Sequence, residues 1–166
     1  TVLIAEIISQ ASGMPIDKFA KQYLFDPLGI TNVSWGHTSD KKVEPSAKRL
    51  YMTSRDMAKI GQLILNKGMW KGEQVVSEQW IEESTTPKTK ITGIDYGFLW
   101  WNIPFKVNEK VLNSKIATGN GGQYIMVFPE LDMVVVFTGG AYNSEEDKVP
   151  FVLMDKALLP TFASEN

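Results

Sequence analysis

Cysteine is absent from this chain of 166 residues, and histidine occurs once, at position 37. The lack of cysteine excludes disulfide bonds, thiolate metal sites and cysteine nucleophiles, and it leaves the redox compartment open. His37 stands between Gly36 and Thr38 with no carboxylate pattern beside it. We therefore expect it to be a surface or capping residue rather than a metal ligand, and we expect no metal and no cofactor.

An excess of basic residues is also lacking, since 17 Lys and Arg stand against 19 Asp and Glu. Proteins that bind nucleic acid usually carry a basic patch, so we expect no nucleic-acid partner. No apolar run approaches the roughly 20 residues of a membrane-spanning helix, so no membrane span is expected in this sequence. The content of 43% hydrophobic and 22% charged residues is that of an ordinary globular domain.

The most informative stretch that is present is a pair of apolar, β-branched runs at Gln123–Phe128 and Met133–Thr138. Only Pro129-Glu130-Leu131-Asp132 separates them, and so short a connection predicts an antiparallel hairpin. Because nearly every position of both runs is apolar, we expect both strands to be buried on both faces, in the middle of a sheet.

Helical spacing of apolar residues dominates the first half of the chain. It predicts helices that end near Gly13, begin at Pro15, follow Thr53-Ser54-Arg55-Asp56 and follow Ser77. Strands are expected at Tyr96–Trp101 and Val111–Ala117, and a closing helix is expected to start near Pro150 and to stop at Pro160. These elements predict an α+β fold, in which helices are followed by an antiparallel β-meander with a C-terminal helix packed on the sheet.

Gly61 falls inside the helix predicted after Thr53. A glycine in a helix lowers its stability by roughly 1 kcal/mol relative to alanine. We expect close packing against a neighbouring element to be the reason for it.

Gly119-Asn120-Gly121-Gly122 stands directly before the first strand of the hairpin. Asn-Gly is the strongest short signal for a hairpin turn, so a turn is one interpretation. The other is a substrate-facing entry to the strand, in which small residues clear space and the backbone amide of Gln123 points at a ligand. A phosphate-binding loop is disfavoured, because neither a helix nor Gly-Lys-Ser/Thr follows.

The aromatic residues Tyr96, Phe98, Trp100 and Trp101 either line a pocket or pack in the core. Neighbouring residues of a strand point to opposite faces, so at most one tryptophan would face a given site. The residues alone mark no nucleophile, because Gly-x-Ser-x-Gly is absent and we expect no Ser-x-x-Lys motif in this chain.

Four stretches resemble, in order, the C-terminal part of the serine beta-lactamase-like family, which includes class C beta-lactamases, penicillin-binding proteins and esterases. They are Ala11–Pro15 with Phe25–Ile30, Leu50–Gly61, Tyr96–Trp101 and Gly119–Asp132. The resemblance implies a partial beta-lactamase/transpeptidase-like fold. Residues 1–94 would then belong to a helical lobe, and residues 95–166 would form an antiparallel sheet with a C-terminal helix. It also implies a serine hydrolase of acyl substrates that works through an acyl-enzyme.

The resemblance further implies that the Ser-x-x-Lys and Tyr-x-Asn motifs lie upstream of Thr1. We therefore expect a fragment that lacks the N-terminal half of its parent and is inactive alone. The family's third motif would fall on Asn120, where most members have Lys or His. A neutral amide brings no positive charge, which favours an ester, amide or peptide substrate over a beta-lactam. The remaining residues implied at the site are Gln123, through its backbone oxyanion donor, and Gly121, Gly122, Tyr96 and Trp100, through substrate binding.

The departure at Asn120 also leaves open a second function, a non-catalytic ligand-binding or sensory module of the same family. The expected partners are a small-molecule or peptide acyl substrate and the missing N-terminal half. Without that half, we expect exposed apolar surface around Ile4, Ile7 and Ile8 and an open strand edge. The family resemblance alone favours an exported or periplasmic protein.

Overall fold

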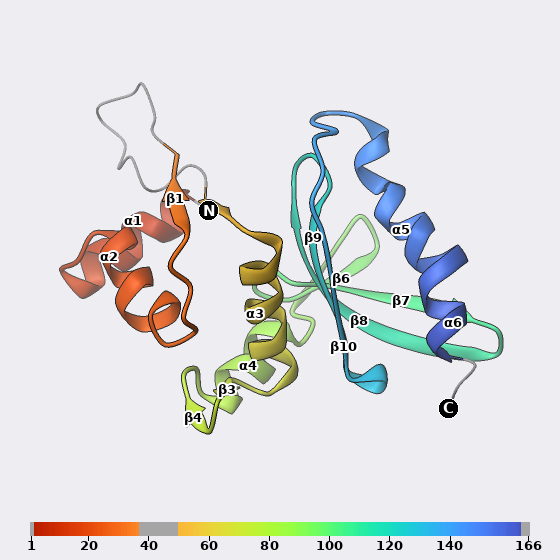
Figure 1. The fold of residues 1–166 in the computed structure, drawn as a ribbon, viewed down its shortest axis with the longest axis horizontal. Coiled ribbons are helices and arrows are strands. Elements are labelled where there is room, and N and C mark those ends of the chain that lie inside the picture. Colours follow the sequence, from red (N-terminus) through yellow and green to blue (C-terminus); the bar gives the residue numbers. More distant parts are fainter. Residues whose placement is uncertain (1, 37–49, 164–166) are drawn as a thin grey trace. The chain divides into compact units, whose positions relative to one another are not determined.

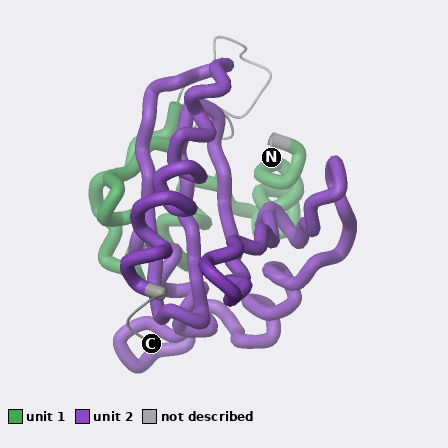
Figure 2. Tube along the Cα trace, turned by 90° about the vertical axis from the view of Figure 1, so that its right-hand side faces the viewer, with its two compact units in different colours: residues 1–56 green, residues 57–166 purple. Residues whose placement is uncertain are grey.

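A computed structural model of the chain describes residues 2–36 and 50–163. His37 and a solvated turn that the sequence predicts at Asp40-Lys41-Lys42 lie outside the described residues. The chain divides into two compact units, residues 1–56 and residues 57–166 (Figure 2). Among the helices described, none is long and apolar enough to cross a membrane.

The first unit is mostly helical. Its elements are α1 (Val2–Ser12), α2 (Ile16–Ala20), the π-helical turn η1 (Lys21–Phe25), and the antiparallel strands β1 (Val33–Trp35) and β2 (Leu50–Met52). Gly13 ends α1 with a φ of +68°, as the sequence predicts, because glycine adopts this conformation without steric cost. Pro15 is the residue before the next helix, also as predicted.

The apolar residues at the start of α1 are largely exposed, as expected. Ile4 is 45% exposed and Ile7 is 57% exposed, whereas Ile8 is half-buried. The exposed surface predicted around these three residues is therefore confirmed for two of them. Such a row of exposed isoleucines is typical of a surface that another element covers.

The second unit holds a six-stranded antiparallel sheet between helices (Figure 1). Its first elements are α3 (Ser54–Leu65, which begins at the end of unit 1), β3 (Met69–Trp70), β4 (Glu73–Gln74) and α4 (Glu78–Thr85). The strands are β5 (Thr89–Ile91), β6 (Ile94–Tyr96), β7 (Trp101–Val107), β8 (Lys110–Gly119), β9 (Gln123–Phe128) and β10 (Met133–Phe137). They follow the order β10-β9-β8-β7-β6-β5, so each strand pairs with its neighbours in sequence, which confirms the predicted meander.

Short 3₁₀ turns and one nearly continuous helix complete the second unit. The turns are η3 (Pro129–Leu131) and η4 (Glu145–Lys148), and the helical segments are α5 (Val149–Leu153), the π-helical η5 (Met154–Leu158) and α6 (Leu159–Ala163). Pro150 lies in the first turn, as predicted. The prediction that Pro160 stops the helix is wrong, because α6 continues through it to Ala163. The wide π turn directly before Pro160 makes room for the ring, which would clash with a carbonyl of a regular helix.

Hydroxyl caps begin two of these helices as the sequence predicts. Thr53 Oγ1 accepts a hydrogen bond from the Asp56 backbone N–H at 3.2 Å and donates to its carboxylate at 2.8 Å. Ser77 Oγ accepts from the Trp80 backbone N–H at 3.2 Å. Both caps satisfy helix N–H groups that have no partner within the helix.

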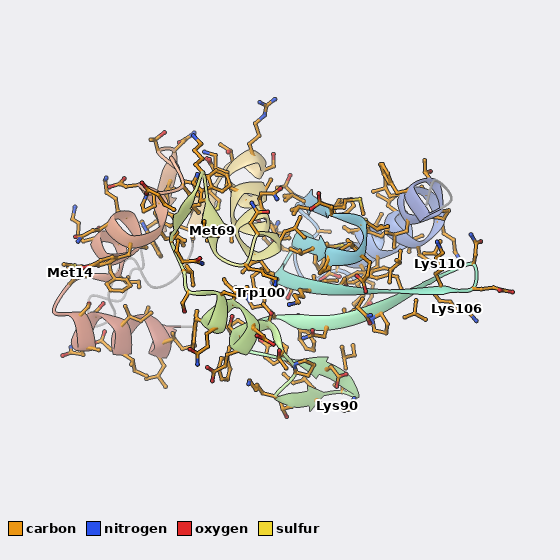
Figure 3. The ribbon with its side chains drawn as sticks, turned by 90° about the horizontal axis from the view of Figure 1, so that it is seen from below. Met14, Met69, Lys90, Trp100, Lys106 and Lys110 are labelled. Carbon is orange, nitrogen blue, oxygen red and sulfur yellow. The ribbon has the colours of Figure 1, made fainter. Side chains whose placement is uncertain are left out.

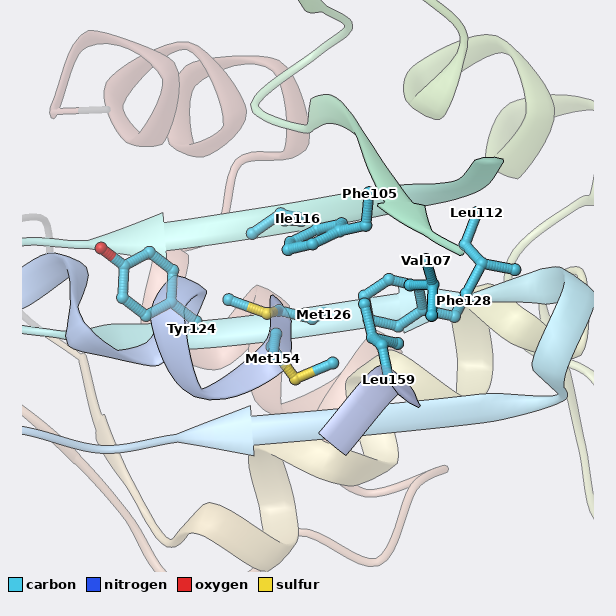
Figure 4. Packing of buried hydrophobic residues seen from close by; sticks show 9 residues of the cluster. All are labelled: Phe105, Val107, Leu112, Ile116, Tyr124, Met126, Phe128, Met154 and Leu159. Carbon is cyan, nitrogen blue, oxygen red and sulfur yellow. The ribbon is translucent and has the colours of Figure 1, made fainter. Parts of the chain in front are cut away.

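Each face of the sheet carries its own hydrophobic cluster. The C-terminal helix packs on one face, where Met154 and Leu159 meet Ile116, Met126 and Phe128 (Figure 4). On the other face, Ile64 of α3 and Ile81 of α4 pack against Ile125 and Val127 of β9. Alternate residues of β9 therefore serve both clusters, which is the double burial predicted for this strand.

Gly61 lets α3 approach the second face closely. A Cβ at this position would lie 2.5 Å from Val134 Cγ1 and 2.8 Å from Ile125 Cγ2. The expectation of close packing is confirmed, because a Cβ fits there only if the side chains of Val134 and Ile125 shift.

Two strand predictions need correction. β10 is the edge strand of the sheet among the described residues, not a central one, and all of its residues are half-buried. An open strand edge is present, as expected. The strand at this edge is β10, which was predicted to lie in the middle of the sheet. Tyr96–Trp101 is not one strand, because the chain turns between Tyr96 and Trp101: the Gly97 N–H donates to the Trp100 carbonyl and the Phe98 N–H donates to the Ser84 carbonyl. These hydrogen bonds, one of them to the end of α4, stabilise a turn here despite the strand propensity of the aromatic residues.

Candidate functional site

Asn120, Gly121 and Gly122 form the turn between β8 and β9. Gly119 and Gln123 are opposite each other in the ladder and close the hairpin. Gly121 and Gly122 have φ values of +98° and +88°, which residues with a Cβ rarely adopt. The hairpin-turn interpretation therefore describes the geometry, and the positive φ at both positions favours glycine there. A turn can still face a substrate, so the second interpretation stays a prediction.

Asn120 is held by the segment that follows β10. Its Nδ2 donates to Asn143 Oδ1 at 3.0 Å, and its Oδ1 accepts from the Asn143 backbone N–H at 3.2 Å. Both asparagines are exposed. The side-chain amide that the sequence marks as the third-motif position is thus fixed in orientation by two reciprocal hydrogen bonds.

The same segment covers the two glycines. The Ala141 N–H donates to the Gly121 carbonyl at 3.2 Å, and a Cβ at Gly121 would lie 2.7 Å from the ring of Tyr142. Gly121 and Gly122 are buried, while Tyr142 is 61% exposed. An exposed aromatic ring lying on a buried, rigid turn is a suitable surface for an apolar part of a ligand.

Gln123 links the turn to the segment after β10 through its side chain. Its Nε2 donates to the Gly139 carbonyl at 2.5 Å and, more weakly, to the Gly121 carbonyl at 3.3 Å. Sequence reasoning assigned a role only to the backbone amide of this residue. The structure adds a positioning role for the side chain, because it bonds two carbonyls that border the turn.

Near this turn, β8 continues beyond the last residue that pairs with β7. Its pairing with β7 ends at Ile116 opposite Trp101, whereas its pairing with β9 continues through Ala117 and Thr118 to Gly119. Successive residues of a strand direct their backbone N–H and C=O groups to alternate sides. Between Ala117 and Gly119, part of the β8 backbone is therefore directed away from β9 with no strand of the described residues beside it. Such an edge can pair with an extended ligand.

Tyr96 and Trp100 lie around the connection that leads into β7, which pairs with β8 on the side away from β9. Tyr96 stacks on Trp101 with ring centroids 4.5 Å apart. Trp100 packs on the cluster that contains Ile125, together with Ala117 of β8, so at least part of its ring serves the core. Figure 3 shows Trp100 at the end of the β7–β8 hairpin remote from Lys106 and Lys110. The predicted contacts of Tyr96 and Trp100 with a substrate stay predictions.

Tyr124 and Asp147 lie behind the turn. Burial raises the pKa of the Tyr124 phenol, and the nearby Asp147 carboxylate raises it further. Tyr124 stacks edge-on against Phe151 at 5.1 Å. It therefore stays a neutral core residue at physiological pH rather than a base.

Sequence reasoning missed Tyr142, Asn143 and Gly139, which complete the surroundings of the turn. The available signal was the run Gly139-Gly140-Ala141 directly after β10, since small residues allow one segment to approach another closely. Sequence reasoning also expected no Ser-x-x-Lys spacing, and this needs correction, because Ser39-Asp40-Lys41-Lys42 has it. These four residues lie outside the described part of the chain and receive no role. In residues 2–36 and 50–163 no group of His, Asp and Glu is arranged to hold a metal ion.

A protein-family model described as Beta-lactamase matches residues 1–158 of this chain. Comparison with curated protein sequences gives no match.

Solved structures with the same fold include the following three. A putative 6-aminohexanoate-dimer hydrolase from Bacillus anthracis has a TM-score of 0.75 and 20% identity over 97% of this chain and 42% of its own. A class C beta-lactamase has a TM-score of 0.65 and 18% identity over 98% and 54%. A penicillin-binding protein homologue from Caulobacter crescentus has a TM-score of 0.64 and 12% identity over 82% and 49%. This chain thus spans about half the length of these relatives.

Proposed function

This chain belongs to the beta-lactamase family, and from that premise we propose that it forms one wall of the acyl-transfer site of a serine hydrolase. The fold and the family are those expected from the sequence. The reaction, the substrate and the role of each residue are proposals. The observation that carries them is the β8 edge at Ala117–Gly119, which ends in a turn held by hydrogen bonds to Gly139, Ala141 and Asn143 of the segment after β10.

In this proposal an acyl substrate lies extended along the free backbone of Ala117–Gly119. Main-chain hydrogen bonds to a strand edge give affinity without demanding a particular side chain. The backbone N–H of Gln123 is one donor of an oxyanion hole. Donors fixed before the reaction begins stabilise the developing negative charge most, and losing one lowers the rate by about 10²–10³-fold in related chemistry.

The nucleophilic serine and the groups that move its proton are supplied by polypeptide outside this chain. A serine attacks the acyl carbon, the leaving group departs with a proton, and water hydrolyses the resulting ester. The same polypeptide is proposed to cover the open edge of β10 and the exposed isoleucines of α1, because both are apolar surfaces without a partner in the described residues. The family gives the only support for export or a periplasmic location.

Asn120 favours a neutral substrate. Its amide has no charge to pair with a substrate carboxylate, and both of its polar atoms already bond Asn143. An ester, an amide or a peptide bond is therefore preferred to a beta-lactam that carries a carboxylate.

The direct test is hydrolysis of a p-nitrophenyl ester by the protein at its natural length, together with labelling by a fluorophosphonate. We expect both, and we expect replacement of the labelled serine by alanine to abolish both. Labelling at no serine, with a folded protein, would contradict the proposal.

The second candidate is a non-catalytic ligand-binding or sensory module. Asn120 favours it, because a neutral amide at the third-motif position cannot give or take a proton, and this amide is bonded to Asn143. The two functions differ in one measurement: a module binds an ester without hydrolysing it, so substrate remains intact at saturation.

A further inference from the structure

A cavity of about 280 Å³ lies where α3 and α4 meet strands β8 and β9. Its apolar walls include Ile64 of α3, Ile81 of α4, Val127 of β9 and Pro129 of the following turn. The first three are buried members of the second hydrophobic cluster. Pockets for drug-sized ligands measure roughly 300–1,000 Å³, so this one suits a smaller molecule.

Lys115 of β8 brings an ammonium group to the wall of this cavity. It is half-buried and lies opposite Val127 in the β8–β9 ladder. Its Nζ donates to Thr85 Oγ1 at 2.7 Å, and that hydroxyl donates its own hydrogen to the Ile81 carbonyl at 2.7 Å. Because an ammonium has three N–H donors, this hydrogen bond leaves two of them for another acceptor.

Lys115 has no counter-ion among the described residues, since none of their ion pairs includes it. At the exposed rim of the cavity, Lys67 and Glu78 neutralise each other at 2.8 Å. The Glu130 carboxylate accepts hydrogen bonds from the backbone and side chain of Asn113. Glu82 is the remaining carboxylate at the cavity, and its side chain is exposed.

Burial has a measurable consequence for this lysine. It lowers the pKa of Lys115. The negative charges of Glu82 and Glu130 raise this pKa, but by less than burial lowers it. The ammonium has lost part of its hydration without gaining an anion in return. An anionic ligand in the cavity would supply the missing counter-ion.

We propose that this cavity binds a small aliphatic monocarboxylate, with its carboxylate on the Lys115 ammonium and its hydrocarbon chain against Ile64, Ile81 and Val127. The inference does not depend on the hydrolase proposal, because it concerns binding at different residues. The carboxylate accepts from the two free Lys115 donors, and the chain leaves water for an apolar wall.

The test is a calorimetric titration of the protein at its natural length with hexanoate, hexan-1-ol and hexylamine. These probes share the chain and differ only in the charge of the head group. Hexanoate is expected to bind about tenfold or more tightly than the alcohol, since hydrogen bonds between charged groups are the stronger ones. Hexylamine is expected to bind weakest.

Variants assign the binding to this cavity. Lys115→Met keeps the length of the side chain and is expected to remove the preference for hexanoate over hexan-1-ol, while Lys106→Met, on the exposed side of β7, is expected to leave it unchanged. Glu82→Gln is expected to raise hexanoate affinity a few-fold, because it removes a like charge. Thr85→Ser, which keeps the hydroxyl, is expected to behave as the original protein does.

The results divide clearly. Loss of the hexanoate preference in Lys115→Met alone, in a variant that still unfolds cooperatively, supports the proposal. No hexanoate binding, tighter binding of hexylamine, or equal hexanoate affinity in Lys115→Met would overturn it. Ester hydrolysis is read in none of these experiments, so failure here says nothing against the proposed hydrolase.

Discussion

β9 and β10 are nearly alike in sequence and differ in environment. Both are short runs of apolar residues joined by η3, yet Tyr124–Phe128 of β9 are all buried, whereas every residue of β10 is half-buried. β9 has a strand on each side and a helical layer on each face, while β10 has a strand on one side only in the part of the chain that the structure describes. Apolar composition therefore identifies a strand of the core, but its neighbours decide how much of it is removed from water.

The largest expected effect comes from replacing a methionine of β9 by alanine, and the same replacement in β10 is its comparison. Met126→Ala in β9 removes a side chain that is 0% exposed, so a cavity is left, and we expect a loss of about 2–5 kcal/mol in the free energy of unfolding. Met133→Ala in half-buried β10 should cost clearly less. Urea unfolding of the two variants measures the difference. Equal losses would mean that β10 is covered as completely as β9 in the protein at its natural length.

Gly61→Ala tests the contact that α3 makes with both strands. Alanine is the better helix former by roughly 1 kcal/mol, but its Cβ would overlap Val134 and Ile125. Overpacking of this kind costs about 1–3 kcal/mol, so we expect net destabilisation in thermal unfolding.

A double variant gives the control for this clash. Val134→Ala removes the atom at 2.5 Å, so Gly61→Ala should be less harmful in its presence than alone. Additive effects would show that the helix moves away instead of clashing.

The segment after β10 and the turn before β9 provide a smaller test. Asn120→Ala removes two hydrogen bonds to Asn143 and is expected to cost about 1 kcal/mol. Asn143→Ala removes only the bond that its Oδ1 accepts, because its backbone N–H is kept, so the double variant should lose no more hydrogen bonds than Asn120→Ala alone. If the turn belongs to the acyl-transfer site, both variants should also lower kcat/KM for an ester, and a change in stability without a change in kcat/KM would separate the turn from the reaction.

The smallest expected effect is a change of stability with pH that arises from Lys115 of β8, the strand next to β9. Burial lowers the pKa of Lys115 from its ordinary value of 10.5, so the unfolded chain keeps this proton to higher pH than the folded chain does. Stability should therefore rise with pH between the lowered pKa and the ordinary one, because the unfolded state binds more protons there.

Lys115→Met removes the titrating group and should flatten this rise. Urea midpoints between neutral pH and about pH 10 provide the measurement. A rise of equal size in the variant would assign it to other groups.

Sequence patterns predicted much of the fold because the relevant forces act locally. The hairpin of β9 and β10, the caps at Thr53 and Ser77 and the end of α1 at Gly13 depend on residues a few positions apart. The meander follows from short connections, and the family resemblance is confirmed by the match over residues 1–158. Gly61 was correctly linked to close packing, although its partner strands could not be named.

The surroundings of the turn could not be predicted in the same way. Asn120 was selected from the sequence, but Asn143 and Tyr142 are brought to it by the return of the chain after β10. Likewise, nothing near Lys115 in the sequence indicates Thr85, which lies on another element and holds its ammonium group. Contacts between distant segments depend on how whole elements pack.

The sequence by itself determined most of the helices, the meander of strands and the membership of the beta-lactamase family. Local propensity and short connections carry that information. Only the tertiary structure decided that, within the described residues, β10 is an edge strand, the end of β8 has no strand on one side and Lys115 has no counter-ion at its cavity. The reason is physical: burial and charge pairing are properties of a position in space, and each depends on every segment that packs around it.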